Sequence, residues 1–403
     1  MKNLLILTYW SYKDALIQTY TLPYVRIIRK NLPPKSKIYL FTIEQDFYKI
    51  SDEDWHAERQ ELLKENIHLI RFKYSKFGIK MALRFAGIIT SLFFLVLTKN
   101  ISKIHAWCTP AGAIGYLLSV LTFKPLIIDS YEPHAESMVE NGEWQRNSRA
   151  FKILFWFERK MSNKANTVIA LTKGMKNYAK QKYDAEFKNY YIKPSMVDLQ
   201  KFSFDNYKDN GLVEKLDFKG KTIGLYAGKF GGIYLEKEIF ELIKEAYNYW
   251  GETLKILLLT NTKKSEIYKF AAEVNIPKNI FEVLYVDYSN IDKYFKLADF
   301  AINPVKPVPS KRYCTSIKDG EYWAMGLPVI ITKNISDDSE IIEKENIGYV
   351  LKELNKKEYI NAVTKIDDLL KGTNKELRFK IRNIAKKYRS FSIAENIYKD
   401  IYG

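Results

Sequence analysis

The stretch Ser316–Ile330, SIKDGEYWAMGLPVI, contains residue types that can bind a phosphate and a diol. It reads as a loop, then a short helix that carries Lys318 and Glu321, then a Gly-Leu-Pro break before a buried strand. A helix N-terminus presents unpaired backbone N–H groups and a partial positive charge, which suit a phosphate. Lys318 adds a positive charge there, and the Glu321 carboxylate can accept hydrogen bonds from both hydroxyls of a ribose. A surface helix with a Lys/Glu pair, followed by a core strand, would give the same spacing.

A glycine-rich segment, Tyr226–Gly232, is a second candidate for phosphate binding. Gly228, Gly231 and Gly232 would let backbone amides approach a diphosphate closely. Lys229 would neutralise the charge that grows on a departing diphosphate. An ordinary glycine turn is the alternative interpretation. Further positive charges at Lys311 and Arg312 precede the Ser316–Ile330 stretch.

In the first half of the chain, polar and aromatic residues follow apolar runs. Asp129, Glu132 and His134 follow one such run, and Trp10 and Tyr12 follow another. Ligands gather at the carboxyl ends of parallel strands. We therefore expect Asp129 or Glu132 to hydrogen-bond to a ligand, and Trp10 and Tyr12 to stack on it. His134 could equally be an ordinary loop residue.

These candidates must be positioned by the elements around them, which alternate between strand and helix along the chain. The alternation predicts an α/β fold with two Rossmann-like domains, each a doubly wound parallel sheet, facing each other across a cleft. The connector Lys193–Phe202 places the boundary after residue 203, giving domains 1–203 and 204–387. The expected strands are Asn3–Thr8, Lys37–Thr42, Ile67–Phe72, Lys103–Trp107, Leu126–Asp129, Val168–Leu171, Thr222–Ala227, Leu254–Thr260, Phe281–Val286, Phe300–Asn303 and Val329–Thr332. The expected helices include Ala15–Lys30, Gly112–Leu121, Glu236–Trp250, Ser265–Glu273 and Asn290–Ala298.

Composition limits the classes of protein. The 403 residues exceed one ordinary core, and the formal net charge of +17 favours anionic partners, whether phosphorylated small molecules, membranes or nucleic acid. The two cysteines and four scattered histidines indicate neither a disulfide framework nor a metal cluster. The basic residues are dispersed and form no recognised nucleic-acid module, so nucleic-acid binding ranks last. The N-terminus runs directly into a strand-like segment without a signal peptide, so we expect a cytoplasmic protein.

Residues 76–98 allow two interpretations. Lys76, Lys80 and Arg84 share one helical stripe, and Phe85–Thr98 is uncharged and apolar. The apolar run is shorter than the ~20 residues that span a bilayer. It therefore predicts either a core-facing helix or a face that rests on an anionic membrane surface, and both hold if one side packs and the other docks.

Several segments, taken in order, resemble the GT-B fold glycosyltransferases, most closely the retaining family 4 enzymes of bacterial surface polysaccharide synthesis. Lys318–Ile330 is similar to their nucleotide-sugar signature of Lys, two variable residues, Glu-Tyr, then Ala-x-Gly-x-Pro-Val-Ile. Lys193–Phe202 is similar to their interdomain segment, and Ala165–Met175 to the end of their N-terminal domain. Ala298-Asp299, before an expected strand, also fits. Ile397–Tyr402 resembles the end of their last helix, which implies that a helix of about 388–403 packs back on the first domain.

The resemblance implies transfer of a sugar from a nucleoside diphosphate sugar to a hydroxyl of a glycan or lipid-linked acceptor, with retention of configuration and no metal or other cofactor. It implies catalytic roles for His134, Lys229 and Glu321, with His134 contacting the transferred sugar. Glu321 matches the second Glu of the family's Glu-x7-Glu motif, and Tyr313 stands at the position of the first. Donor contacts then fall to Gly228, Gly231, Gly232, Lys311, Tyr313 and Lys318. On the same resemblance, Asp129 or Glu132 would position an acceptor hydroxyl, and Trp10 and Tyr12 would stack on a sugar acceptor. A sugar-nucleotide epimerase on the same fold and a non-catalytic GT-B subunit that binds a partner or lipid remain alternatives.

Overall fold

The computed structural model describes residues 2–48, 50–74, 79–204, 209–371 and 374–403, and the chain forms two compact units. Unit 1 comprises Met1–Pro194 together with Ser392–Gly403, and unit 2 comprises Ser195–Phe391. The chain therefore passes from unit 1 to unit 2 after Pro194, before the boundary expected after residue 203, because the connector Ser195–Phe202 packs within unit 2. Its buried residues Val197 and Phe202 belong to that unit's core.

A parallel sheet of seven strands in the order β3-β2-β1-β4-β5-β6-β7 forms the centre of unit 1. β1 is buried along its whole length, as its run of apolar residues predicts. The order reverses direction between β1 and β4, the arrangement of a doubly wound fold. The strands are β1 (Asn3–Leu7), β2 (Ile38–Glu44), β3 (Ile67–Lys73), β4 (Ile101–Trp107), β5 (Leu126–Tyr131), β6 (Thr167–Ala170) and β7 (Asn189–Ile192).

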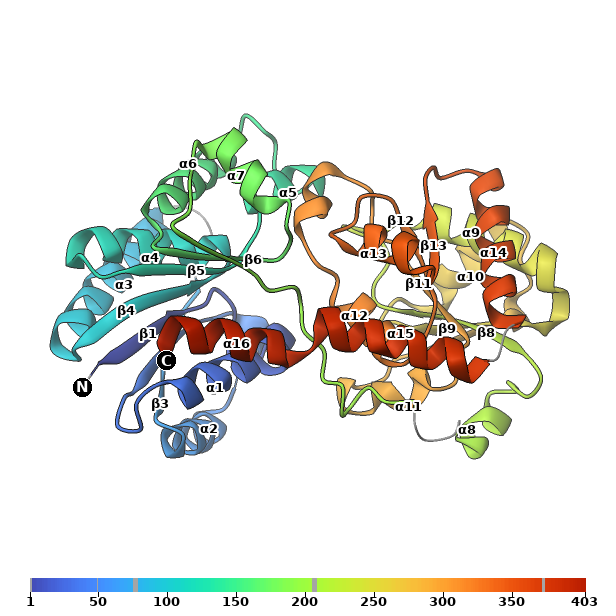
Figure 1. Ribbon diagram of the computed structural model, residues 1–403, viewed down its shortest axis with the longest axis horizontal. Coiled ribbons are helices and arrows are strands. Elements are labelled where there is room, and N and C mark those ends of the chain that lie inside the picture. The colour runs from blue at the N-terminus through green and yellow to red at the C-terminus, as the bar shows by residue number, and fades with distance from the viewer. Residues whose placement is uncertain (1, 49, 75–78, 205–208, 372–373) are drawn as a thin grey trace. The chain divides into compact units, whose positions relative to one another are not determined.

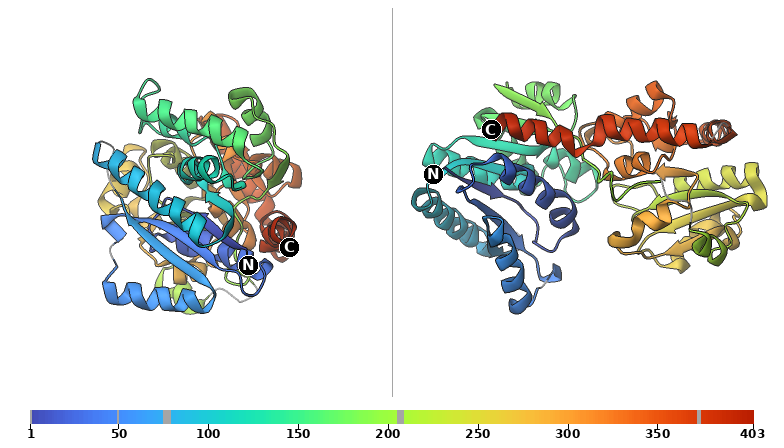
Figure 2. Two further views of the ribbon diagram at one scale, coloured as in Figure 1. Left: turned by 90° about the vertical axis from the view of Figure 1, so that its left-hand side faces the viewer. Right: turned by 60° about the horizontal axis from the view of Figure 1, so that its bottom comes forward.

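Helices cover both faces of this sheet (Figure 1). They are α1 (Leu22–Asn31), α2 (Asp52–Lys64), α3 (Ile79–Thr98), α4 (Cys108–Thr122), α5 (His134–Glu140), α6 (Arg149–Lys164), α7 (Met175–Tyr183) and α16 (Phe391–Tyr402). α3, α4 and α6 pack side by side, whereas α16 lies beside α1, where the rings of Tyr24 and Tyr398 are 6.2 Å apart (Figures 1 and 2).

A buried charge cluster fixes α16 to the sheet of unit 1. The carboxylate of Asp129 in β5 accepts a hydrogen bond from the Tyr398 hydroxyl at 2.6 Å and lies 3.1 Å from Lys193 Nζ. His105 Nε2 lies 3.3 Å from the same carboxylate, and His105 Nδ1 is 2.6 Å from the Tyr402 hydroxyl. The helix expected to return to the first domain is therefore held there by polar contacts with β4 and β5.

Unit 2 is built on a parallel sheet of six strands in the order β10-β9-β8-β11-β12-β13. Its core has two parts, one on each face, and Trp323 and Phe240 are among their fully buried residues. The strands are β8 (Thr222–Ala227), β9 (Leu254–Leu259), β10 (Phe281–Leu284), β11 (Phe300–Asn303), β12 (Val329–Thr332) and β13 (Gly348–Leu351). The helices are α8 (Asn210–Lys215), α9 (Lys237–Trp250), α10 (Lys264–Glu273), α11 (Ile291–Phe295), α12 (Ile317–Ala324), α13 (Asp338–Glu345), α14 (Lys356–Lys371) and α15 (Asn374–Arg389).

The structure corrects some of the expected elements. The helix expected at Ala15–Lys30 begins as a π-helical turn, Leu16–Thr21, and continues as α1. The helix expected at Asn290–Ala298 is shortened to the five residues of α11. β7 and β13 extend the two sheets where no strand was expected, and β7 is only partly buried because it lies at an edge. The other expected strands agree with the structure to within a few residues.

Candidate active site

The glycine-rich segment of unit 2 forms a loop directly after β8. Gly228, Gly231 and Gly232 have φ angles of 153°, 76° and 60°, which side chains rarely allow. Two tyrosines hold the loop: the Tyr226 hydroxyl donates to the carbonyl of Lys229, and the Tyr322 hydroxyl accepts from the Ala227 amide at 3.0 Å. The loop is therefore fixed by side chains from β8 and α12.

Lys318 lies against this loop. A Cβ atom at Gly228 would be 2.8 Å from Lys318 Cε and 3.0 Å from Nζ, so a side chain there would displace the end of the lysine. Lys318 Nζ donates to the Tyr234 hydroxyl at 2.6 Å and also lies 4.0 Å from the centre of that ring. The structure thus brings together two regions, Tyr226–Gly232 and Ser316–Ile330, that the sequence marked separately.

A pocket of about 230 Å³ opens at the N-terminus of α12. Ser316 precedes the helix, and its side chain does not cap it. Amides in the first turn of a helix favour anions. The lining residues are Ile233, Tyr234, Val305, Lys311, Cys314, Thr315, Ser316, Ile317, Lys318 and Ile335.

Glu321 lies one turn further along α12 and is 6% exposed. The Tyr288 hydroxyl donates to its Oε1 at 3.0 Å. Burial raises the pKa of Glu321 to about 7, and the Tyr288 hydrogen bond and the charges of Lys318 and Lys201 limit the rise. Above about pH 7 Glu321 is therefore an ionised carboxylate, which can accept hydrogen bonds from both hydroxyls of a diol.

The remaining predicted donor residues differ in position. Lys229 is exposed, at the tip of the glycine loop, and its Nζ would lie 4.0 Å from a Cβ at Gly232. Lys311 is buried and lines the pocket beside α12. Tyr313 is half-buried and ends a 3₁₀ turn, Pro309–Tyr313.

Asp319 was treated as a variable position from the sequence, but the structure gives it a clear role. It is fully buried, and the side-chain amide of Asn303 donates to both carboxylate oxygens at 2.8 Å. Burial and the neighbouring Asp338 raise the pKa of Asp319 well above its ordinary value. Arg389 pairs with Asp338. This cluster links α12 to β11, α13 and α15, and so positions Lys318 and Glu321.

In unit 1, His134 and Glu132 lie just beyond the carboxyl end of β5. His134 is the first residue of α5, and its Nδ1 lies 3.4 Å from Glu132 Oε1. Both side chains are about one quarter exposed, at 27% and 23%, so a ligand can reach them. Trp10, beyond the end of β1, is half-buried. These three keep the surface access that acceptor or sugar binding requires.

The structure contradicts the acceptor role predicted for Asp129 and Tyr12. Asp129 is fully buried in the cluster with Lys193 and His105. Burial alone would raise its pKa, but Lys193, His105 and Tyr398 lower the pKa to about 2. Tyr12 is 1% exposed, and its hydroxyl donates to Glu58 at 3.0 Å. Both residues stabilise unit 1 and cannot stack on or position an acceptor.

The predicted membrane segment is described in part. Residues 75–78, which include Lys76, lie outside the described residues, and the side chain of Lys80 is not described. Along the described part of α3, one face is buried and another exposes Leu83, Phe94 and Leu97 at 72%, 58% and 55%. Within the described residues, no helix combines the length and apolar character that crossing a membrane requires.

The comparisons with known proteins agree with this architecture. Residues 308–400 match the family described as glucosyltransferase 3-like, C-terminal domain. The structure is similar to that of HepE from Anabaena, solved in complex with UDP, with a TM-score of 0.71 and 13% identity over 100% of this chain and 99% of HepE. The chain has the GT-B glycosyltransferase fold.

Two further solved structures support the GT-B assignment. Sucrose-phosphate synthase from Thermosynechococcus elongatus gives a TM-score of 0.71 at 14% identity, covering 100% of this chain and 98% of its own. WaaG, a glycosyltransferase involved in lipopolysaccharide biosynthesis, gives 0.69 at 13% identity and covers both chains completely, at 100% each. A search of curated protein sequences gives no match. The solved structures show that the chain has this fold, and the family match covers residues 308–400 of unit 2 and the helix that follows it.

Proposed function

We propose that this GT-B protein transfers a sugar from a nucleoside diphosphate sugar to a hydroxyl of a glycan or lipid-linked acceptor. The observation that carries the proposal is the order of groups within unit 2. The glycine loop and Lys318 come first, and the buried carboxyl of Glu321 follows one turn along α12. A nucleoside diphosphate presents an anionic diphosphate and a ribose diol, which match these groups in chemistry.

In the proposed reaction, the bond between the anomeric carbon and the diphosphate oxygen breaks, and a bond to the acceptor oxygen forms. Negative charge grows on the departing diphosphate, where Lys229 and Lys318 can stabilise it. We propose that these lysines act without a metal ion. Glu321 binds the ribose, and His134 of unit 1 contacts the transferred sugar. The resemblance to family 4 enzymes supports retention of anomeric configuration.

The proposed setting is bacterial surface polysaccharide synthesis, such as that of capsule or O-antigen, on the inner face of the plasma membrane. WaaG, which shares the fold, is involved in lipopolysaccharide biosynthesis. The exposed apolar residues of α3 support contact with a membrane.

The donor site can be tested with UDP-glucose first, because HepE was solved in complex with UDP-glucose. We expect UDP-glucose to raise the melting temperature of the wild-type protein and to release UDP when an acceptor is supplied. Glu321→Ala should lose both effects, whereas the control variant Glu273→Ala, at an exposed position on α10, should keep them. A panel of other nucleotide sugars extends the test.

Full activity of folded Glu321→Ala would overturn the assignment of the donor site. Release of a free, epimerised sugar in the absence of any acceptor would instead favour the epimerase. A protein that binds no member of the panel would favour the non-catalytic alternative.

A further inference from the structure

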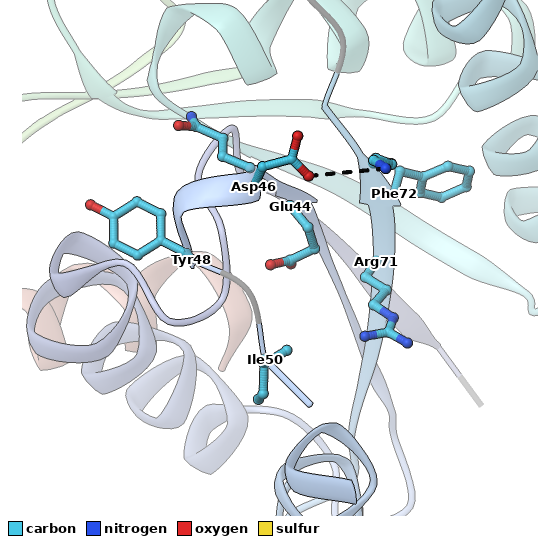
Figure 3. A pocket seen from close by; sticks show the side chains of 8 residues that line it. Glu44, Asp46, Tyr48, Ile50, Arg71 and Phe72 are labelled. Carbon is cyan, nitrogen blue, oxygen red and sulfur yellow. Dashed lines mark ion pairs between the residues drawn. The ribbon is translucent and has the colours of Figure 1, made fainter. Parts of the chain in front are cut away.

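Two neighbouring pockets lie at the end of β3, one of the two edge strands of the sheet in unit 1. Phe72 and Lys73 line both. Figure 3 shows Arg71 and Phe72 side by side on this strand, and successive residues of a strand point to opposite faces of the sheet. The pockets therefore meet where the strand ends.

The first pocket, of about 400 Å³, is lined mostly by residues with polar side chains. Figure 3 shows Glu44 and Arg71 on adjacent strands, with Tyr48 and Ile50 beside them. Gln45 and Asp46 complete the lining. Carboxylate, amide and guanidinium groups hydrogen-bond to sugar hydroxyls, and an aromatic ring packs on a sugar ring.

The second pocket, of about 500 Å³, lies along α3. Beyond Phe72 and Lys73 it is lined by Leu83, Arg84, Gly87, Ile88 and Ser91. Ile88 is buried, and Leu83 is 72% exposed at the edge. Leu83 and Ile88, with Phe72, give it an apolar surface that suits a hydrocarbon chain.

Gly87 is the most informative residue of this second pocket. Glycine in the middle of a helix is unfavourable and calls for a packing or functional reason. Packing gives none, because a Cβ atom at Gly87 would meet no described atom within 4 Å. Gly87 is exposed, so its missing side chain leaves the helix surface bare where it lines the pocket.

Two positive charges lie where the pockets meet. Lys73 is exposed, and its nearest acidic partner, Asp46, is 4.0 Å away. Arg84 Nη1 donates to the carbonyl of Tyr74 at 2.8 Å, which holds its guanidinium at the end of β3. An anionic group between the polar and apolar pockets would lie near both.

We propose that the two pockets bind one amphipathic acceptor, a sugar joined through a phosphate to a hydrocarbon chain. The sugar occupies the Glu44–Arg71 pocket, the phosphate lies near Lys73 and Arg84, and the chain passes over Gly87. This inference rests on the proposed function, since it names the class of lipid-linked acceptor.

Binding of decyl glucosyl phosphate, a short single-chain phosphodiester, tests the inference by calorimetry on the full chain. Decyl glucoside, which has no phosphate, and glucose 1-phosphate, which has no chain, are the comparison compounds. We expect the phosphodiester to bind wild-type protein at least tenfold more tightly than either. Gly87→Phe should weaken its binding at least tenfold, and Gly87→Ala should leave it nearly unchanged. Lys73→Ala should weaken the phosphodiester but not decyl glucoside.

The UDP-induced rise in melting temperature serves as an independent control of folding and of the donor site. The inference would be overturned if the Gly87→Phe variant keeps this rise in melting temperature and still binds the phosphodiester as tightly as the wild type. Equal binding of the phosphodiester and decyl glucoside would overturn the role of the phosphate. Intact phosphodiester binding without any response to UDP or nucleotide sugars would overturn the proposed donor site alone.

Discussion

Glu321→Gln changes the charge of one buried side chain while keeping its shape. Burial raises the pKa of Glu321 to about 7 from an ordinary value of 4.5. The folded state therefore binds the proton more tightly than the unfolded state, so the free energy of unfolding falls as the pH rises from about 4.5 through 7. At 1.36 kcal/mol per pKa unit, the loss between pH 5 and pH 8 amounts to about 2–3 kcal/mol.

Urea denaturation of both proteins at pH 5 and pH 8 isolates this contribution. Other groups, such as Glu158, whose pKa burial also raises to about 7, act equally in both proteins and cancel. We expect the wild type to lose about 2–3 kcal/mol more than Glu321→Gln on going from pH 5 to pH 8. Equal losses in the two proteins would refute a buried Glu321 with a raised pKa.

The same variant tests the role of Glu321 toward the nucleotide. A hydrogen bond to a charged group contributes about 1.5–3 kcal/mol, so Glu321→Gln should bind UDP roughly 10- to 100-fold more weakly at pH 8. At pH 5 the wild-type carboxyl is protonated, and the two affinities should converge. An affinity for UDP that does not differ between the proteins at pH 8 would exclude Glu321 from the ribose contact.

Two further predictions concern unit 1. Asp129→Asn leaves Lys193 buried without its counter-charge and should lower the free energy of unfolding by about 3–5 kcal/mol, measured by denaturation at pH 7; a loss below about 1 kcal/mol would contradict the buried pair. Because the pKa of Asp129 is lowered to about 2, its stabilisation is complete above the ordinary value near 3.8 and should disappear as the pH falls toward 2. Phe94→Asp on α3 should weaken cosedimentation with anionic vesicles several-fold, whereas Phe47→Asp, at another exposed phenylalanine, should not; equal cosedimentation of the two variants would argue against a membrane-facing α3.

Local patterns predicted much of the fold and the placement of Lys318 and Glu321 on one short helix. β8 and β12 are mostly apolar segments, β8 followed by Gly228 and β12 preceded by Pro328, as is typical of parallel strands buried on both faces. Both ends of α12 were recognisable, because a polar loop precedes the helix and Gly326, with a φ of 70°, follows it. Lys318 and Glu321 were predicted because they share one turn of that helix.

Contacts between distant residues could not be predicted in the same way. Asp129 ends an apolar run, as a ligand-binding residue would, but the residues that bury it include Lys193 and Tyr398, and Tyr398 is 269 positions away. Tyr12 follows β1 as an accessible aromatic residue would, yet its hydroxyl binds Glu58 of α2. The hydrogen bonds from Tyr288 to Glu321 and from Lys318 to Tyr234 join separate segments, and no local signal marked either tyrosine.

The two units differ in how charges beside their strand ends are compensated, and the difference favours different ligands. In unit 2, Lys318 donates to the phenol of Tyr234 and Glu321 accepts from that of Tyr288. In this contact Lys318 is hydrogen-bonded to a hydroxyl group and not to a carboxylate. An incoming diphosphate can therefore attract the lysine without first breaking an ion pair there. In unit 1, Glu132 lies 3.4 Å from His134. Such a pair can present both a hydrogen-bond donor and an acceptor, which suits a neutral hydroxyl. Glycosyl transfer needs both kinds of surface, one for an anionic leaving group and one for an uncharged nucleophile.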